Sequence, residues 1–193
     1  MTGLWILIGI VVVLLLIVYF WYMALIKRRN QALEALSSID VQLRKRFDLV
    51  PNVLKIASKF MAHEKGLMEQ ITALRTKSMQ GYQEKDPGAV QEHLQASGQL
   101  GGAMMQLFAV AENYPELKSN ETMVTAQNTY SEVEGHIAAA RRFYNAAVTQ
   151  LNNSVQIFPG NLIAGMAGVK EMPFYEEADE AAKAPVDAGD YLK

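Results

Sequence analysis

The chain is short, nearly neutral and free of cysteine, with 193 residues and a formal net charge of −2. That length suits one domain with an appendage. A chain without cysteine has neither a disulfide framework nor thiolate chemistry, and its weakly negative balance does not favour nucleic acid as a partner.

The first element in chain order is a long apolar run. From Leu4 to Ile26 there is no charge, and Gly9 is the only residue outside the apolar set. A helix over this run is about 34 Å long, enough to cross a hydrocarbon core of ~30 Å. No basic residue precedes the run and no small-residue cleavage site follows it. The run therefore predicts an uncleaved transmembrane anchor rather than a signal peptide.

The flanking charges predict how the anchor is oriented. Lys27, Arg28 and Arg29 follow the run directly, whereas no Lys or Arg precedes it. The positive-inside rule then places the C-terminal bulk in the cytoplasm and a short N-terminus outside. The aromatic stretch Tyr19–Tyr22 fits the inner membrane interface. We therefore expect a single-pass protein whose first partner is the lipid bilayer.

After the anchor, apolar residues recur at alternating spacings of three and four as far as Ile71, which is typical of a helix that packs along one seam. The register passes through Pro51 without slipping, and the surrounding stretch FDLVPN has no glycine for a hairpin. Because proline kinks a helix without always ending it, we predict one long helix, kinked at Pro51, that reaches about Met79.

Two clear breaks divide the rest of the chain. The stretch Gly81–Gly88 has two glycines and a proline, which indicates a loop. A helix over about 89–111 follows, and its glycines predict close approach to a neighbour. A last long helix, capped by Ser119 or Asn120, runs to about Ile157. The following stretch FPGNLIAGMAGV can form a short apolar helix.

These elements predict an all-α protein, in which a single N-terminal transmembrane helix continues into an antiparallel bundle of three to four long helices. Residues 1–26 would form the short outer N-terminus and the transmembrane helix, and residues 27–170 the cytoplasmic bundle. Residues 171–193 are acidic and rich in alanine, so we expect a loose tail.

Six polar residues fall on otherwise apolar helix faces. Buried charges are costly unless they are paired, and their usual role in bundles is to fix the register. We predict that Arg141 is buried against Glu64, with Glu134 or Asn145 completing the network. A ligand site or proton relay inside the bundle is the alternative. The predicted network comprises Asp40, Arg46, Glu64, Glu134, Arg141 and Asn145.

No motif indicates catalysis. The pair His63-Glu64 lacks the second histidine that a zincin helix needs one turn on. There is no Glu-x-x-His pair of a di-iron bundle and no Gly-rich phosphate loop ahead of a helix. The basic cluster Arg44–Arg46 lacks interleaved aromatic residues that would stack on bases. We therefore expect no enzyme activity, no metal, no cofactor and no nucleic acid.

An apolar stripe lies on the first part of the predicted rod. If the rod runs straight to Met79, the later helices are too short to cover its membrane-proximal end. An uncovered apolar stripe normally marks an interface, and copies anchored in one membrane present it at the same height. We therefore predict a homo-oligomer that assembles through Leu33, Leu36, Ile39 and Leu43.

The chain resembles the LemA family. The similarity rests on the N-terminal anchor followed by VQLRKRFDLVPNV, on His63-Glu64, on YPELK, and on EGHIAAARRFYNAAVTQLNNSVQIFPGNLIA from Glu134. The resemblance implies a membrane-anchored cytoplasmic bundle in the inner membrane of a bacterium, and no known reaction. Family members near membrane peptidase genes, or in magnetosome membranes, favour a self-associating scaffold. The alternative is an accessory subunit of a membrane enzyme such as a membrane peptidase.

Overall fold

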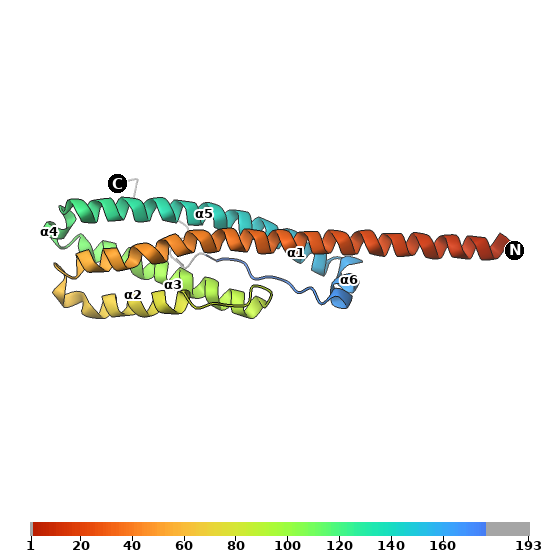
Figure 1. Cartoon of the computed structure of the whole chain (residues 1–193), viewed down its shortest axis with the longest axis horizontal. Coiled ribbons are helices and arrows are strands. Elements are labelled where there is room, and N and C mark those ends of the chain that lie inside the picture. Colours follow the sequence, from red (N-terminus) through yellow and green to blue (C-terminus); the bar gives the residue numbers. More distant parts are fainter. Residues whose placement is uncertain (1, 177–193) are drawn as a thin grey trace, which may run out of the picture. The chain divides into compact units, whose positions relative to one another are not determined.

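The computed structural model describes residues 2–176, which form helices and connecting segments without a strand. The all-α fold is confirmed. In chain order the elements are α1 (Thr2–Ala57), η1 (Ala62–Glu64), α2 (Lys65–Ser78), α3 (Pro87–Ala111), α4 (Pro115–Lys118), α5 (Glu121–Gln156) and α6 (Gly160–Ala167) (Figure 1).

The chain divides into two compact units. Unit 1 consists of Met1–Leu43, Tyr82–Gln91 and Val133–Phe174. Unit 2 consists of Arg44–Gly81 and Glu92–Glu132, with the chain from Tyr175 onward. Both units draw on α1, α3 and α5, so each is described by its own contacts.

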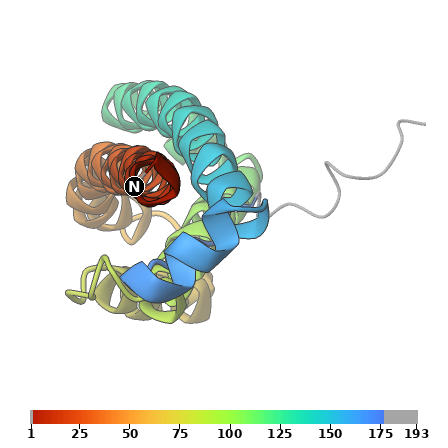
Figure 2. The ribbon, with the colours of Figure 1, turned by 90° about the vertical axis from the view of Figure 1, so that its right-hand side faces the viewer.

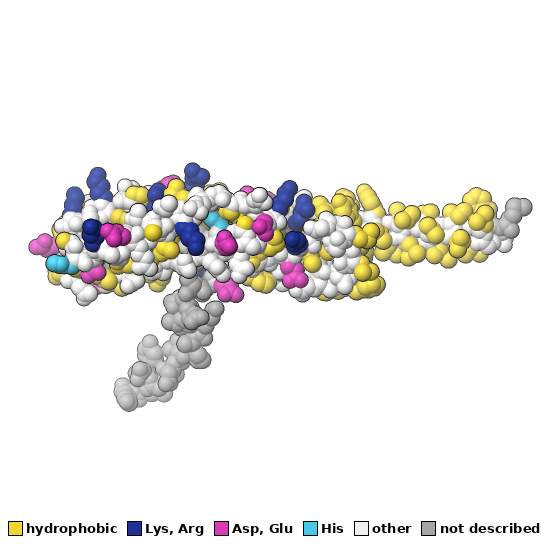
Figure 3. Space-filling view, turned by 90° about the horizontal axis from the view of Figure 1, so that it is seen from below, with side chains coloured by type: hydrophobic (Ala, Val, Ile, Leu, Met, Phe, Trp, Pro, Cys, Tyr) yellow, Lys and Arg dark blue, Asp and Glu magenta, His cyan; other side chains and the backbone are white. Residues whose placement is uncertain are grey.

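The helix α1 runs without interruption from the apolar run into the bundle, over 56 residues. Its N-terminal part is long and apolar enough to cross a membrane, with a mean hydropathy of 3.0 and none of that window buried. Figure 3 shows this part as a continuous hydrophobic surface. Burial begins at Leu25, which is 2 % exposed. The surface of α1 thus changes near Leu25 from one suited to lipid to one packed against protein.

The predicted single helix from the anchor to Met79 is wrong. Pro51 lies inside α1 on an exposed face, but the helix continues past it and ends at Ala57. The N–H groups of Phe60 and Met61 donate to the Ala57 carbonyl and close the last turn. No non-glycine residue in the described chain has positive φ, so this reversal needed no glycine. The predicted bend at Pro51 stays a prediction.

Two side-chain contacts within unit 2 join α1 to α2 and α3 to α5. Arg75 Nε on α2 donates to the Phe47 carbonyl on α1 at 2.7 Å. The rings of Phe108 on α3 and Tyr130 on α5 meet edge to face, with centroids 5.1 Å apart. The core of the unit is apolar, and its largest fully buried side chains are Met61, Ile71, Leu100, Met104, Leu107, Leu117 and Met123.

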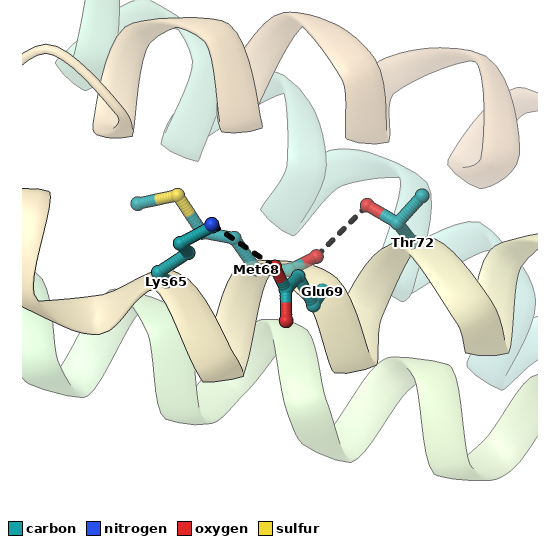
Figure 4. Close-up of polar contacts among 4 residues, drawn as sticks. All are labelled: Lys65, Met68, Glu69 and Thr72. Carbon is teal, nitrogen blue, oxygen red and sulfur yellow. Dashed lines mark hydrogen bonds and ion pairs between the residues drawn. The ribbon is translucent and has the colours of Figure 1, made fainter.

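The outer face of α2 carries weak local contacts. Lys65 and Glu69 form an exposed i,i+4 ion pair at 3.7 Å, and Thr72 Oγ1 donates to the Met68 carbonyl at 2.8 Å (Figure 4). Such exposed pairs contribute a few tenths of a kcal/mol. The position of α2 in unit 2 therefore rests mainly on buried residues such as Ile71.

In unit 1, α5 returns alongside α1 in the opposite direction. Arg28 on α1 donates to Ser154 near the end of α5, while Asp40 further along α1 lies close enough to Tyr144 to affect its titration. These two contacts bracket the part of the apolar stripe from Leu33 to Ile39. On α5, the fully buried Val148 lies between the same contacts.

The predicted oligomer interface is therefore corrected. Leu36, Ile39 and Leu43 are fully buried within the chain, and Leu33 is half-buried. The prediction assumed a straight rod to Met79, which would have sent the last helix away from the membrane. Because the chain reverses after Ala57, it passes through α2 and α3 before α5, and α5 runs back along the stripe.

The chain after α6 is packed rather than loose. We call residues 168–174 the C-terminal strap. Met172 within it is 6 % exposed, and Tyr175 just beyond it is 5 % exposed. This corrects the expectation of a loose tail from residue 171 for residues 171–176. Residues 177–193 lie outside the described residues.

Candidate functional site at the end of the membrane helix

The first feature of the site is a junction between the anchor and the end of α5. Arg28 belongs to the basic cluster that ends the apolar run, and its Nη1 donates to Ser154 Oγ. The Ser154 hydroxyl donates in turn to the Gln150 carbonyl at 2.7 Å. The junction fixes the last turns of α5 at the level where the apolar run of α1 ends.

The short helix α6 lies beside the apolar run itself (Figure 2). An open groove of about 400 Å³ separates them, lined from α1 by Leu15, Val18, Tyr19 and Tyr22, and from α6 by Ile163, Met166 and Ala167. Its only polar side-chain groups are two phenols. The groove can thus hold an alkyl chain, but it offers no carboxylate, imidazole or amine for acid–base chemistry or for binding a metal.

Two glycines allow α6 to sit where it does. A Cβ on Gly160 would overlap the backbone carbonyl of Ser154, so only glycine permits so close a return of the chain to α5. At the other end, Gly168 adopts φ 64° and ψ 25°, the left-handed conformation that closes many helices. The Val169 N–H then donates to the Ala164 carbonyl at 3.0 Å and starts the strap.

The strap is held by side chains of α5. The Asn152 amide makes two hydrogen bonds with the backbone of Met172: Nδ2 donates to the carbonyl and Oδ1 accepts from the N–H, both at 2.9 Å. The buried Tyr144 hydroxyl donates to the Pro173 carbonyl at 2.8 Å. One amide side chain thus satisfies both backbone groups of Met172, as a neighbouring strand would.

Asp40, one of the predicted network residues, belongs to a tyrosine cluster. It is half-buried and accepts from the Tyr82 hydroxyl at 2.6 Å. Burial raises the pKa of Tyr82 well above its usual range, and the bond to Asp40 and the charge of Asp40 raise it further. Burial, with Asp40 as the second cause, also raises the pKa of Tyr144. Both phenols therefore stay protonated and serve as hydrogen-bond donors.

Among the residues of the predicted network, only Arg46 is buried, with 3 % of its surface exposed. Its Nη1 donates to the Ser97 carbonyl of α3 at 2.8 Å within unit 2. A Cβ on Gly101 would lie 3.2 Å from the same nitrogen. The glycines of α3 were expected to admit a neighbouring backbone, but at Gly101 the approaching group is this guanidinium. Arg46 thus attaches the end of α1 to α3.

The other predicted network residues are half-buried rather than buried. Glu64 ends η1 in unit 2 and accepts a long hydrogen bond, 3.5 Å, from the Tyr114 hydroxyl. Glu134, Arg141 and Asn145 lie on α5 in unit 1, each partly exposed. The pairing of Arg141 with Glu64 stays a prediction. Within residues 2–176 no group of three or more His, Asp or Glu side chains is arranged to hold a metal ion.

Sequence reasoning missed the groups that hold the strap and α6. Asn152 follows Asn145 by seven residues, two helical turns, so it shares a face of α5 with that predicted network residue and the spacing could have marked it. Its partner Met172 lies 20 residues later in a stretch without periodicity. No sequence signal pairs such residues, and only the return of the chain along α5 brings them together.

The family model described as LemA family matches residues 35–187. The chain belongs to the LemA family. The matched residues begin within α1, at Ala35, and include the rest of the bundle, α6 and the strap. Ser154, α6 and the strap fall within the matched residues, whereas Arg28 and the α1 residues that line the groove precede them.

Curated relatives of this LemA-family chain come from magnetotactic bacteria. Magnetosome proteins MamQ 1 and MamQ 2 of Paramagnetospirillum magneticum are each 26% identical to it, over 73% of this chain and 59% of theirs. Magnetosome protein MamQ of Magnetospirillum gryphiswaldense is 23% identical, over 81% of this chain and 65% of its own. The chain spans about three fifths of the length of these relatives. The family and these relatives, with the apolar α1, indicate a membrane protein of a non-catalytic type.

Proposed function

We propose that this protein is a non-enzymatic scaffold, anchored by α1 on the cytoplasmic face of a bacterial inner membrane. The observation that carries the proposal is the continuity of α1, which passes from an apolar, exposed segment into a buried bundle core without a linker. A helix has no free hinge, so the anchor fixes the orientation of the bundle as well as its location. An enzyme or receptor tethered only for location would need no such continuity.

The relatives support a structural role. They are named as proteins of the magnetosome, and this chain aligns with more than two thirds of its own length to each of them. A chain that covers its own apolar stripe does not need a second copy to bury it. Self-association is part of the proposal, and its interface must lie outside Leu36, Ile39 and Leu43, because these residues are buried.

The cytoplasmic orientation is tested by reporter fusions. The basic residues Lys27, Arg28 and Arg29 follow the apolar run, and we expect a C-terminal alkaline phosphatase fusion to be inactive and a C-terminal green fluorescent protein fusion to be bright. The matched control replaces the three basic residues by glutamine and adds three lysines after Met1. Strong phosphatase activity from the unmodified fusion would overturn the orientation.

The scaffold role is tested by purification in mild detergent. A tagged copy expressed beside an untagged copy should capture the untagged copy, and native mass should give an integer multiple of the chain mass. A stoichiometric foreign subunit without a second copy would instead favour an accessory subunit of a membrane enzyme, such as a membrane peptidase. A strictly monomeric chain without partners would contradict both roles.

A further inference from the structure

The depth of α6 follows from the residues that face it. The groove beside α6 is lined by Leu15, Val18, Tyr19 and Tyr22 of α1. At 1.5 Å per residue, Leu15 lies about 18 Å along the helix from Lys27, and Tyr22 about 8 Å. If the bilayer ended before Leu15, only the run from Leu4 to Leu14 would span it, about 17 Å against a core of ~30 Å. The bilayer must therefore reach the level of α6.

The surface of α6 and of the turn before it suits that level. Phe158 is 73% exposed and Met166 is 86% exposed, and Ile157 and Leu162 are also exposed large hydrophobic residues. From Phe143 to Val169 the chain carries no charged residue. Each exposed side chain of this kind would gain roughly 1.5–3 kcal/mol of free energy if it moved from water into an apolar environment. Four such side chains within ten residues form an apolar patch. Its exposure to water costs free energy, whereas its contact with lipid is favourable.

Several backbone groups of the turn are paired within the chain, as a medium without water requires. In a bilayer each unpaired N–H or C=O costs several kcal/mol. The Ile157 N–H donates to the Asn153 carbonyl at 3.0 Å, and the Asn161 N–H to the Ile157 carbonyl at 3.1 Å. The Leu162 N–H donates to Asn161 Oδ1 at 2.8 Å, and Pro159 has no N–H to satisfy. The turn between α5 and α6 thus pairs these groups within the chain.

We propose that the α5–α6 turn and α6, residues 157–167, form a second membrane contact, with their exposed apolar side chains among lipid acyl chains beside the anchor. Basic residues mark the boundary on both sides of the segment: Arg28 meets Ser154 just before it, and Lys170 follows it. An interfacial helix of this kind enters about 5–10 Å below the headgroups. The anchor is then braced at two points, which prevents the bundle from tilting about α1.

The test uses single cysteines, because the native chain has none. Full-length protein with Met166→Cys or Leu162→Cys is labelled with an environment-sensitive fluorophore and reconstituted into vesicles of phosphatidylethanolamine and phosphatidylglycerol. Emission is compared between plain lipids and lipids that carry a quenching nitroxide on the acyl chain. Val11→Cys in the apolar run is the positive control. Met105→Cys on α3, which is 63% exposed, is the matched control.

We expect labels at residues 162 and 166 to lose emission to the lipid quencher to about the same extent as the label at Val11, and the label at Met105 to lose none. Labels at 162 and 166 that behave like the Met105 label, while Val11 is quenched, would overturn the second contact and leave the anchor intact. Labels reached by neither the lipid quencher nor aqueous iodide would mean that protein covers α6, which also overturns it. Absence of quenching at Val11 would overturn the anchor and the proposed function together.

Discussion

Replacement of Asn152 by alanine should release the C-terminal strap. The Asn152 amide is 8 % exposed and supplies both hydrogen bonds of the Met172 backbone. A buried N–H or C=O that loses its partner costs about 1–3 kcal/mol, and water that enters the gap recovers part of this cost. For the two groups together we expect Asn152→Ala to lower the free energy of opening by about 2–4 kcal/mol.

The measurement is amide hydrogen exchange of the intact protein in detergent micelles, followed at Met172. Since every 1.4 kcal/mol is a factor of ten, exchange at this amide should accelerate by roughly thirty- to several-hundred-fold. The global free energy of unfolding in urea should also fall. This decrease should not exceed the decrease in the free energy of strap opening, because the strap can open while the bundle stays folded.

The control is Asn153→Ala, which changes the same residue type on the next, exposed position of α5. A surface substitution of this kind usually changes stability by less than about 0.5 kcal/mol. Equal and small effects of the two variants on the Met172 amide would refute the reasoning, because they would mean that the strap is held by Tyr144 or by apolar packing and not by the Asn152 amide.

Three further predictions, tested with five substitutions, concern other parts of the fold and are measured by urea unfolding in detergent. Gly102→Ala should stabilise the fold by about 0.5–1 kcal/mol, because alanine favours a helix and nothing lies near the added Cβ. Gly101→Ala should not stabilise it, because the added Cβ would crowd the buried Arg46 guanidinium. Equal stabilisation by the two substitutions would contradict this contact. Leu36→Ala should cost about 2–5 kcal/mol, and the exposed Val41→Ala under about 0.5; a small loss at Leu36 would mean that the stripe is open. The raised pKa of Tyr82 makes the folded state hold a proton that the unfolded state releases above pH ~10, so stability should fall as pH rises past that value. Tyr82→Phe should flatten this alkaline loss, and an unchanged slope would remove Tyr82 as its cause.

The elements bounded by local chemistry were predictable. The loop after α2 is rich in glycine and proline, and α3 begins there at Pro87. Asn120 was one of two expected caps for the last helix, and its Oδ1 accepts from the Met123 N–H at 3.1 Å. The charge-free run, the short apolar α6 and the end of α5 near Ile157 follow from composition and residue type alone. In each case a side chain or a backbone preference within a few residues decides the structure.

The reversal after Ala57 could not be predicted in this way. It is made by backbone hydrogen bonds that any residue can form, and Ser58–Met61 contains no glycine, proline or asparagine. The apolar spacing even continues through it, so the pattern favours an uninterrupted helix. The error then extended to the site: a straight rod exposes Leu36 and Leu43, and only the folded order of α2, α3 and α5 shows that they are buried.

The same reversal bears on how the protein can act as a scaffold. A stripe shared between copies would make folding inseparable from assembly, as in obligate oligomers that have no stable folded monomer. Here α5 covers the stripe within one chain, so a single copy has a complete core in unit 1 before it meets another copy. Association can therefore use a separate surface and be weak or reversible without loss of the fold. To cover the stripe, α5 must return to the end of the apolar run. The packing of α5 on α1 that completes the core of unit 1 therefore also brings the last turn of α5 and α6 to the membrane.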